Sequence, residues 1–193
     1  MFLIDLSRWL SSAIALLLLA LQLPAVMVLL SRLLKGPTRR PPLQPRPATP
    51  EQKGAVSVVV PTLNEVARLG PCLQGLSQQT DEVREILIVD SHSQDGTRDL
   101  VQAAQAHEPR LRLMTDDPLP PAWVGRPWAL HHGYTHSDPH SEWILGLDAD
   151  TQPQPGLVPA LMAAAAAENY DLVSLSPRFI LKSPGEIWLQ PAL

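Results

Sequence analysis

The chain has almost no cysteine, since Cys72 is the only one among its 193 residues. One thiol cannot form an internal disulfide, so we expect a reducing compartment and a buried, hydrophobic role for Cys72. The sequence also lacks an excess of basic residues, because its formal net charge is -4. This charge argues against a polyanion-binding surface and excludes nucleic acid as an expected partner.

A long apolar run is present near the N-terminus, at positions 13–30, and only Gln22 interrupts it. At 1.5 Å per residue it reaches ~27 Å, close to the ~30 Å of a bilayer's hydrocarbon core. We therefore expect residues 1–35 to form a single-pass membrane anchor. Arg8 is the only basic residue before the run, whereas several basic residues follow it, so the positive-inside rule predicts that the rest of the chain is cytoplasmic. The basic residues that follow are Arg32, Lys35, Arg39, Arg40 and Arg46.

Two other interpretations of this run are open. A cleaved secretory signal is less favoured, because the run is long and no small-x-small cleavage site precedes the basic cluster. A re-entrant hairpin is possible near Pro24, since proline breaks helices. After the run, six prolines lie between positions 36 and 50. They favour extended polyproline conformation over packing, so residues 36–54 are predicted to be a semi-rigid tether.

Residues 55–193 are predicted to form an α/β domain, because short aliphatic runs alternate with segments of helical periodicity. Strands separated by helical crossovers predict a mostly parallel sheet with helices on both faces, and ligands of such sheets bind beyond the carboxyl ends of the strands. The expected strands are 56–60, 85–89, 111–114, 143–147 and 172–175, and the expected helices are 66–79, 97–107, 128–135 and 157–168.

Polar residues follow three of these strands. The first, ended by Pro61, leads into Asn64 and Glu65, and the second leads into Asp90. The strand at 143–147 runs directly into Asp148 and Asp150. Two carboxylates at such a spacing suit a divalent cation that bridges a pyrophosphate, because hard cations take oxygen ligands and neutralise phosphate charge. The pattern therefore indicates chemistry on a nucleoside diphosphate.

The order of these motifs, together with Gly125-Arg126-x-x-Ala129-Leu130-x-x-Gly133, resembles the nucleotide-binding half of family 2 glycosyltransferases, which have the GT-A (Rossmann-like) fold. The resemblance covers about residues 55–177. It implies that Pro61, Asn64 and Glu65 line a nucleotide pocket. Helix capping by Asn64 or Glu65 is the structural alternative.

The same resemblance implies that Asp90 accepts a hydrogen bond from a base N–H, usually uracil, although a simple strand-end turn would also place an aspartate there. Asp148 and Asp150 match the family's DXD motif, in which Asp148 contacts ribose or metal and Asp150 coordinates Mg²⁺ or Mn²⁺. Asp-x-Asp is also common in turns. A haloacid-type phosphatase would require Thr or Val at position 152, which is Gln.

Arg126 stands where the family usually has lysine near the sugar nucleotide, so the charge is kept and the donor geometry changes. His131 or His132 occupies the region where many members have asparagine. For Trp123 and Trp128 we expect packing. The segment 118–126 is similar to a membrane-associated subgroup that includes hopanoid and carotenoid glycosyltransferases, which implies a lipid or polyisoprenoid-type acceptor.

Three functions remain open. The first is a membrane-anchored transferase that moves a sugar from a UDP-sugar to a hydroxyl acceptor by metal-dependent inverting displacement. The second is a tethered, non-catalytic nucleotide-sugar-binding remnant. The third is a nucleotidyltransferase that makes sugar nucleotides. The sequence argues against it, because the glycine-rich, Arg-containing loop expected after the first strand is absent from this chain. The resemblance places the general base in an acceptor half for which these 193 residues offer no candidate, so we expect a fragment or a partner that supplies it. Asp95-Gly96-Thr97 is predicted to be structural, with Asp95 capping the helix near Thr97.

Overall fold

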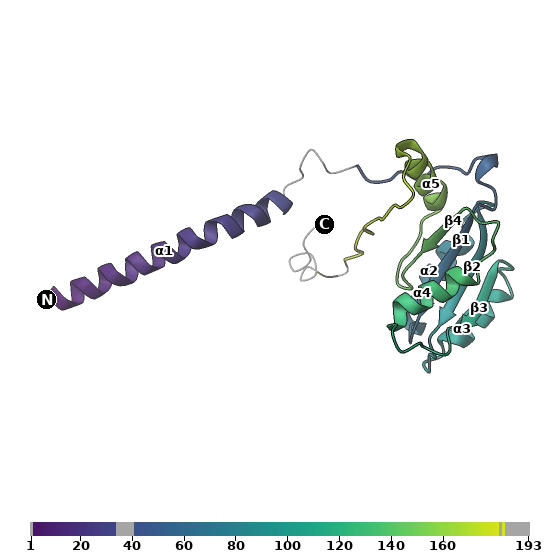
Figure 1. Cartoon of the computed structure of the whole chain (residues 1–193), viewed down its shortest axis with the longest axis horizontal. Helices are drawn as coiled ribbons and strands as arrows, with labels where there is room; N and C mark the ends of the chain where they lie inside the picture. The colour runs from purple at the N-terminus through teal and green to yellow at the C-terminus, as the bar shows by residue number, and fades with distance from the viewer. Residues whose placement is uncertain (1, 34–40, 182, 184–193) are drawn as a thin grey trace. The chain divides into compact units, whose positions relative to one another are not determined.

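The computed structural model describes residues 2–33, 41–181 and 183. Its internal contacts divide the chain into two units, Met1–Pro42 with Ser176–Leu193, and Leu43–Leu175. The sequence from position 184 to 191 also predicts the start of a helix, and these residues lie outside the described ones. Figure 1 shows the order of the elements along the chain.

The first unit contains one long helix, α1 (Phe2–Leu33). Its segment Ser12–Ser31 is long and apolar enough to cross a membrane, by length and composition, and a signal sequence near an N-terminus would meet the same criterion. The helix continues through Pro24, so the re-entrant hairpin is not what the structure has. Leucine and alanine, which dominate the run, are strong helix formers. Their helix propensity compensates for the one backbone hydrogen bond that Pro24 cannot donate.

The second unit is built on a four-stranded, entirely parallel sheet with the order β3-β2-β1-β4. The strands are β1 (Val56–Thr62), β2 (Val83–Asp90), β3 (Leu111–Thr115) and β4 (Trp143–Gly146). β1 and β2 are buried on both faces, as expected for near-continuous aliphatic runs in a parallel sheet. The predicted fold class is therefore confirmed.

Strand β1 is longer than predicted, because it continues through Pro61 to Thr62. The N–H of Leu147 donates to the carbonyl of Val59, so the backbone polar groups of Val59 point toward β4. The backbone nitrogen of Pro61, two residues later, points to the same side. The last paired residue of β4 is Gly146, opposite Val59. No β4 acceptor lies opposite Pro61 in this described sheet, so the missing donor of the proline costs no ladder bond.

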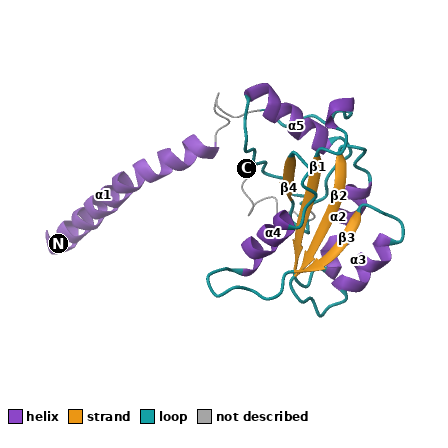
Figure 2. Cartoon of the chain, turned by 45° about the vertical axis from the view of Figure 1, so that its right-hand side comes forward, coloured by secondary structure: helices purple, strands orange, loops and turns teal. Residues whose placement is uncertain are grey.

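Helices cover both faces of the sheet, as Figure 2 shows. They are α2 (Val66–Ser77), α3 (Thr97–Gln105), α4 (Gly125–Thr135) and α5 (Leu157–Glu168). Even-numbered β1 residues such as Val58 pack with Leu69 of α2 and Val101 of α3 in the larger core. Val59 packs with Ala129 of α4 in a smaller cluster on the opposite face. The alternation of side chains along each strand thus feeds two hydrophobic layers.

The predicted strand at 172–175 is wrong. The structure has irregular backbone there, with Leu172 87% exposed and Leu175 46% exposed. A strand requires a neighbour that accepts its backbone hydrogen bonds, and within the described residues β4 pairs only with β1. The aliphatic pattern alone could not show that no neighbouring strand is available.

Part of the predicted tether is packed rather than free. The N–H of Arg46 bonds to the carbonyl of Gly156 at 3.2 Å, and the side-chain amide of Gln52 donates to the carbonyl of Pro159 at 3.3 Å. Gly156 has φ +77° and would bring a Cβ within 2.7 Å of the Arg46 carbonyl oxygen. The proline-rich composition predicted extended backbone, but Pro50–Gln52 form a short 3-10 helix, and Arg46 bonds to the residue before the start of α5.

Candidate functional site

The carboxyl ends of the strands meet at one edge of the sheet. Thr62, at the end of β1, is in register with Asp90, at the end of β2, and Asp90 is in register with Thr115 of β3. β4 ends beside β1, so Asp148 and Asp150 follow at the same edge. Only β1 separates β2 from β4, which corresponds to about 10 Å at the usual strand spacing. Asp90, Asp148 and Asp150 therefore lie along one edge of the sheet.

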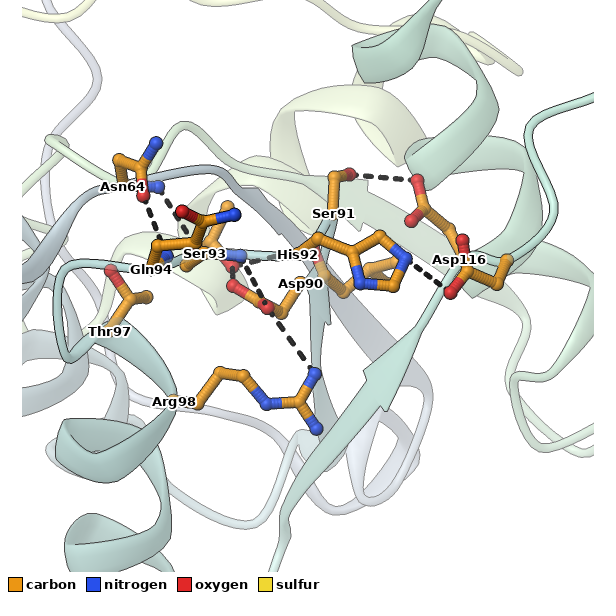
Figure 3. Close-up of polar contacts among 12 residues, drawn as sticks. Asn64, Asp90, Ser91, His92, Ser93, Gln94, Thr97, Arg98 and Asp116 are labelled. Atoms are coloured by element: carbon orange, nitrogen blue, oxygen red, sulfur yellow. Dashed lines mark hydrogen bonds and ion pairs between the residues drawn. The ribbon is translucent and has the colours of Figure 1, made fainter.

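Asp90 is completely buried and its carboxylate is held by several groups, as Figure 3 shows. Its Oδ2 accepts the N–H of Ser93 at 3.0 Å and lies 3.5 Å from an Arg98 guanidinium nitrogen. Its Oδ1 accepts the Thr62 hydroxyl at 3.3 Å. These contacts supply hydrogen-bond partners for both oxygens of a side chain that lies at a buried strand end.

Asn64 and Glu65 lie in the loop between β1 and α2. Asn64 has φ +56°, and its side-chain oxygen accepts the N–H of Gln94 at 2.9 Å. The backbone N–H of Asn64 donates to the Ser93 hydroxyl at 2.8 Å. Glu65 is the N-cap residue of α2, but its side chain forms no capping hydrogen bond, and the first helical N–H, that of Val66, donates to Asp95 at 3.0 Å. The described structure therefore has no side-chain cap of α2 from Asn64 or Glu65.

The Glu65 carboxylate has an unused acceptor. Its Oε1 accepts a hydrogen bond from Arg68 at 3.1 Å. Its Oε2 is 2.9 Å from the same Arg68 nitrogen, yet it is buried and has no hydrogen-bond donor in the part of the chain that the structure describes. A buried carboxylate oxygen without a donor is costly unless a ligand supplies one.

Asp95 has the predicted structural role. Its Oδ1 accepts the N–H and the hydroxyl of Thr97 at 3.0 and 2.5 Å, so it caps the start of α3 as well as that of α2. These bonds, led by the Thr97 hydroxyl, lower the pKa of Asp95. Gly96 has φ +94°, the left-handed turn that glycine favours.

The Asp-x-Asp segment lies in the turn after β4, and both carboxylates are exposed. Oδ1 of Asp148 forms an ion pair with Arg126, the first basic side chain of α4. Asp150 forms no hydrogen bond or ion pair with any described residue. Two oxygen-donor carboxylates in one open turn fit a hard divalent cation that completes its coordination with phosphate oxygens and water. No group of three or more His, Cys, Asp or Glu side chains converges in the described ranges.

Cys72 lies beneath this turn, and its thiol is 3.9 Å from the carbonyl of Asp148. Burial raises the pKa of Cys72 to about 12, and the charges of Asp150 and Asp148 add to this effect. The thiol is therefore neutral and unreactive. The expectation of a buried hydrophobic role for Cys72 agrees with this environment.

The aromatic residues around α4 pack on one another. The ring of Trp123 stacks on His131 at 4.8 Å between centroids and lies 5.3 Å from Trp128. The indole N–H of Trp128 donates to the carbonyl of Asp116. Burial, together with the nearby His136, lowers the pKa of His132. Packing is thus what the structure shows for both tryptophans.

Sequence reasoning missed two charged residues at the sheet edge. Asp116 follows β3, is buried, and accepts the Ser91 hydroxyl at 2.8 Å. It follows the same rule that identified Asp90, since it stands directly after a strand. Arg98 lies on the first turn of α3 and pairs with Asp90. Nothing in the local sequence around Arg98 signals this pairing, which depends on the approach of α3 to the end of β2.

The chain is similar in sequence and in fold to known proteins. Over 138 residues the chain is 28% identical to a 4,4'-diaponeurosporenoate glycosyltransferase of Staphylococcus haemolyticus, covering 70% of this chain and 35% of that protein. Over 127 residues it is 32% identical to an undecaprenyl-phosphate mannosyltransferase of Micrococcus luteus, covering 64% and 48%. The chain thus spans about half or less of the length of these relatives.

Among solved structures, the mannosyltransferase PcManGT of Pyrobaculum calidifontis, in complex with GDP-Man and Mn²⁺, is similar with a TM-score of 0.53 and 26% identity. The match covers 72% of this chain and 39% of that one. The glucosyl-3-phosphoglycerate synthase of Mycobacterium tuberculosis has a TM-score of 0.50 at 26% identity, covering 62% and 45%. Residues 57–192 match the model of glycosyl transferase family 2. The chain therefore belongs to glycosyl transferase family 2 and has the GT-A type of helix-flanked parallel sheet.

Proposed function

We propose that this protein transfers a sugar from a nucleotide-diphosphate sugar to the hydroxyl group of a lipid acceptor at a membrane. The observation that carries the proposal is the meeting of Asp90, Asp148 and Asp150 at one sheet edge, with Arg126 paired to Asp148. A buried carboxylate suits a base N–H, and exposed carboxylates beside a guanidinium suit a metal-bound diphosphate.

In the proposal the nucleoside lies along the ends of β1 and β2. Pro61 and Asn64 line the pocket, and Oε2 of Glu65, which accepts no hydrogen bond from the described residues, accepts one from the nucleoside. Asp90 accepts the base N–H. For this to occur, the Arg98 side chain must move away, because Arg98, Ser93 and Thr62 already contact the Asp90 carboxylate.

Asp150 and Asp148 would hold Mg²⁺ or Mn²⁺, which would stabilise the negative charge of the departing nucleoside diphosphate. The complex of PcManGT with Mn²⁺ supports a divalent cation. Arg126 would place a second positive charge on the phosphate oxygens, with the planar donors that suit them. The chain's own contribution is thus to position the diphosphate and to balance its charge.

The proposed reaction is a single displacement with inversion. The acceptor oxygen attacks the anomeric carbon as the bond from that carbon to the diphosphate oxygen breaks, and a carboxylate takes the acceptor's proton. We assign no residue of this chain to that base. Its place would be on the acceptor side of the sugar.

The lipid acceptor is supported by the undecaprenyl-phosphate transferase and the diaponeurosporenoate transferase among the relatives. It is also consistent with the candidate span Ser12–Ser31. We propose that α1 anchors the protein in the membrane. The basic residues after the span favour a cytoplasmic position for the sheet unit.

The base preference is an open part of the proposal, since the resemblance implies uracil whereas PcManGT holds GDP-Man. The test is calorimetry on the full chain in detergent with UDP and GDP, each with and without Mn²⁺, followed by sugar transfer to lipid extracts. We expect metal-dependent binding of UDP and transfer to lipid. Binding without transfer would identify a nucleotide-sugar-binding protein, and no metal-dependent binding of either nucleotide would refute the proposed site.

A further inference from the structure

The connection between β3 and α4 carries an apolar surface that the proposed chemistry does not use. Residues 118–124, which we name the apolar loop, contain no charged and no hydrogen-bonding side chain except the indole of Trp123. Leu119 is 51% exposed, Trp123 38% and Val124 67%. In Figure 2 this connection runs outward from the end of β3 before it turns into α4. Three large exposed apolar side chains in one short loop indicate contact with another apolar phase.

The apolar loop is held in place rather than free to collapse. The backbone N–H of Trp123 donates to the carbonyl of Pro120 at 3.0 Å, and the Trp123 ring stacks on His131. Before the loop, Asp117 forms an ion pair with His92. Prolines at three of its seven positions fix further backbone angles. A loop that is fixed with its apolar side chains outward is suited to a partner surface.

The candidate membrane span makes a lipid bilayer the expected partner of the apolar loop. Between the candidate span and the start of the sheet unit lie residues 32–42, eleven positions. Fully extended, that length of chain reaches at most about 40 Å. If α1 is anchored, the sheet unit therefore stays close to the membrane surface.

The composition of the apolar loop fits the headgroup region of a membrane. Tryptophan favours this region because its ring is apolar and its N–H is polar. The loop itself, residues 118–124, carries no acidic side chain that anionic lipid headgroups would repel.

We propose that the apolar loop inserts into the headgroup region of the bilayer that holds α1, so that the protein contacts the membrane at a second point. The inference rests on the anchor in the proposed function. The loop begins two residues after Asp116, which is bonded to the residue following Asp90. Its insertion would bring the edge of the sheet that carries the carboxylates to the membrane, where the hydroxyl of a lipid acceptor lies.

The test uses the full chain in phosphatidylcholine–phosphatidylglycerol liposomes, with an environment-sensitive dye on Val124→Cys. The matched control carries the dye on Gln102→Cys, an exposed residue of α3. Cys72 stays unlabelled because its side chain is completely buried. We expect lipids with a nitroxide in the acyl chain to quench the Val124 dye several-fold more strongly than the control dye. Aqueous iodide should quench only the control dye strongly.

Equal quenching of the two dyes by the nitroxide lipids would overturn the inference. Shielding of the Val124 dye from both quenchers would also overturn it, because protein rather than lipid would then cover the loop. A chain that does not float with liposomes refutes the anchor and the inference together. The readout does not need sugar transfer, so insertion without transfer would refute the proposed function and leave the membrane contact standing.

Discussion

Arg126 forms an ion pair with Asp148, so the first turn of α4 is tied to the Asp-x-Asp turn after β4. Both side chains are about half exposed or more. An exposed pair of this kind adds little to stability, so either charge can turn to a ligand at small cost. In the proposed function Arg126 turns to the diphosphate when Asp148 turns to the cation.

Arg126→Ala is expected to weaken binding of the nucleotide sugar by about tenfold to a hundredfold, the range for loss of a hydrogen bond to a charged group. Arg126→Lys should recover part of this affinity, because it keeps the charge and loses the planar donors. Affinity for Mn²⁺ alone should not fall in Arg126→Ala, since Asp148 is released from its ion pair. Calorimetry with nucleotide and with metal separates the two effects, and equal nucleotide affinity in all three proteins would remove Arg126 from the site.

Asp150→Ala should abolish most of the Mn²⁺-dependent gain in nucleotide affinity and leave the melting temperature nearly unchanged, because its carboxylate is exposed and has no partner among the described residues. Asp95→Ala should do the reverse and lower the melting temperature by several degrees, since Asp95 caps two helices. Thermal scans and metal-dependent titrations on both variants provide the comparison. If the two variants lose metal-dependent affinity equally, the roles assigned to them are wrong.

Gly133→Ala is expected to destabilise the sheet unit by about 1–3 kcal/mol, the usual cost of adding a methyl group to a packed core. A Cβ at Gly133 would collide with Val59 of β1 and come within 3.2 Å of Val89 of β2. Gly125→Ala, in the same helix, is the control, because a Cβ there meets nothing within 4 Å. Urea unfolding followed by tryptophan fluorescence measures both, and a neutral Gly133→Ala would contradict this packing.

His92 should titrate above its ordinary pKa. Its hydrogen bond to Asp117, aided by the charges of Asp117, Asp116 and Asp90, raises the pKa of the imidazole. A raised pKa means that the pair contributes stability below the ordinary histidine pKa, near 6.5, and loses it as pH rises through the higher folded value. Carbon-detected titration of labelled histidines, with His92→Asn for assignment, gives this pKa. Asp117→Asn should return it toward the ordinary value, and an unchanged pKa in that variant would show that Asp117 is not the cause.

Much of the fold could be predicted because aliphatic strands and helical periodicity are local signals. The helix at 157–168 was predicted with its observed bounds, and the other helices within a few residues. The strand at 172–175 failed because strand formation depends on a distant partner. The predicted end of β1 was too early, because Pro61 does not end the strand. Its missing N–H costs no hydrogen bond where β4 offers no acceptor opposite it.

The candidate site was predictable to the extent that residues at strand ends share an edge in a parallel sheet. That rule located Asp90 and the Asp-x-Asp turn, and it would also have found Asp116. It could not find the contact between Arg98 and Asp90, nor the pair formed by His92 and Asp117, because each joins different loops or elements. Side chains that meet only after folding leave no spacing signal.

The hydrogen bonds that join the loop after β1 to the loop after β2 have a thermodynamic consequence. The first loop, with the first residue of α2, bonds to the second loop and to the first residue of α3. The residues on one side are Asn64, Glu65 and Val66, and those on the other are Ser93, Gln94, Asp95 and Thr97. The two loops therefore hold each other in one conformation. The conformational entropy of both loops is lost during folding, so binding of a small molecule does not have to order them again. Disturbance of either loop should shift the other by the same motion.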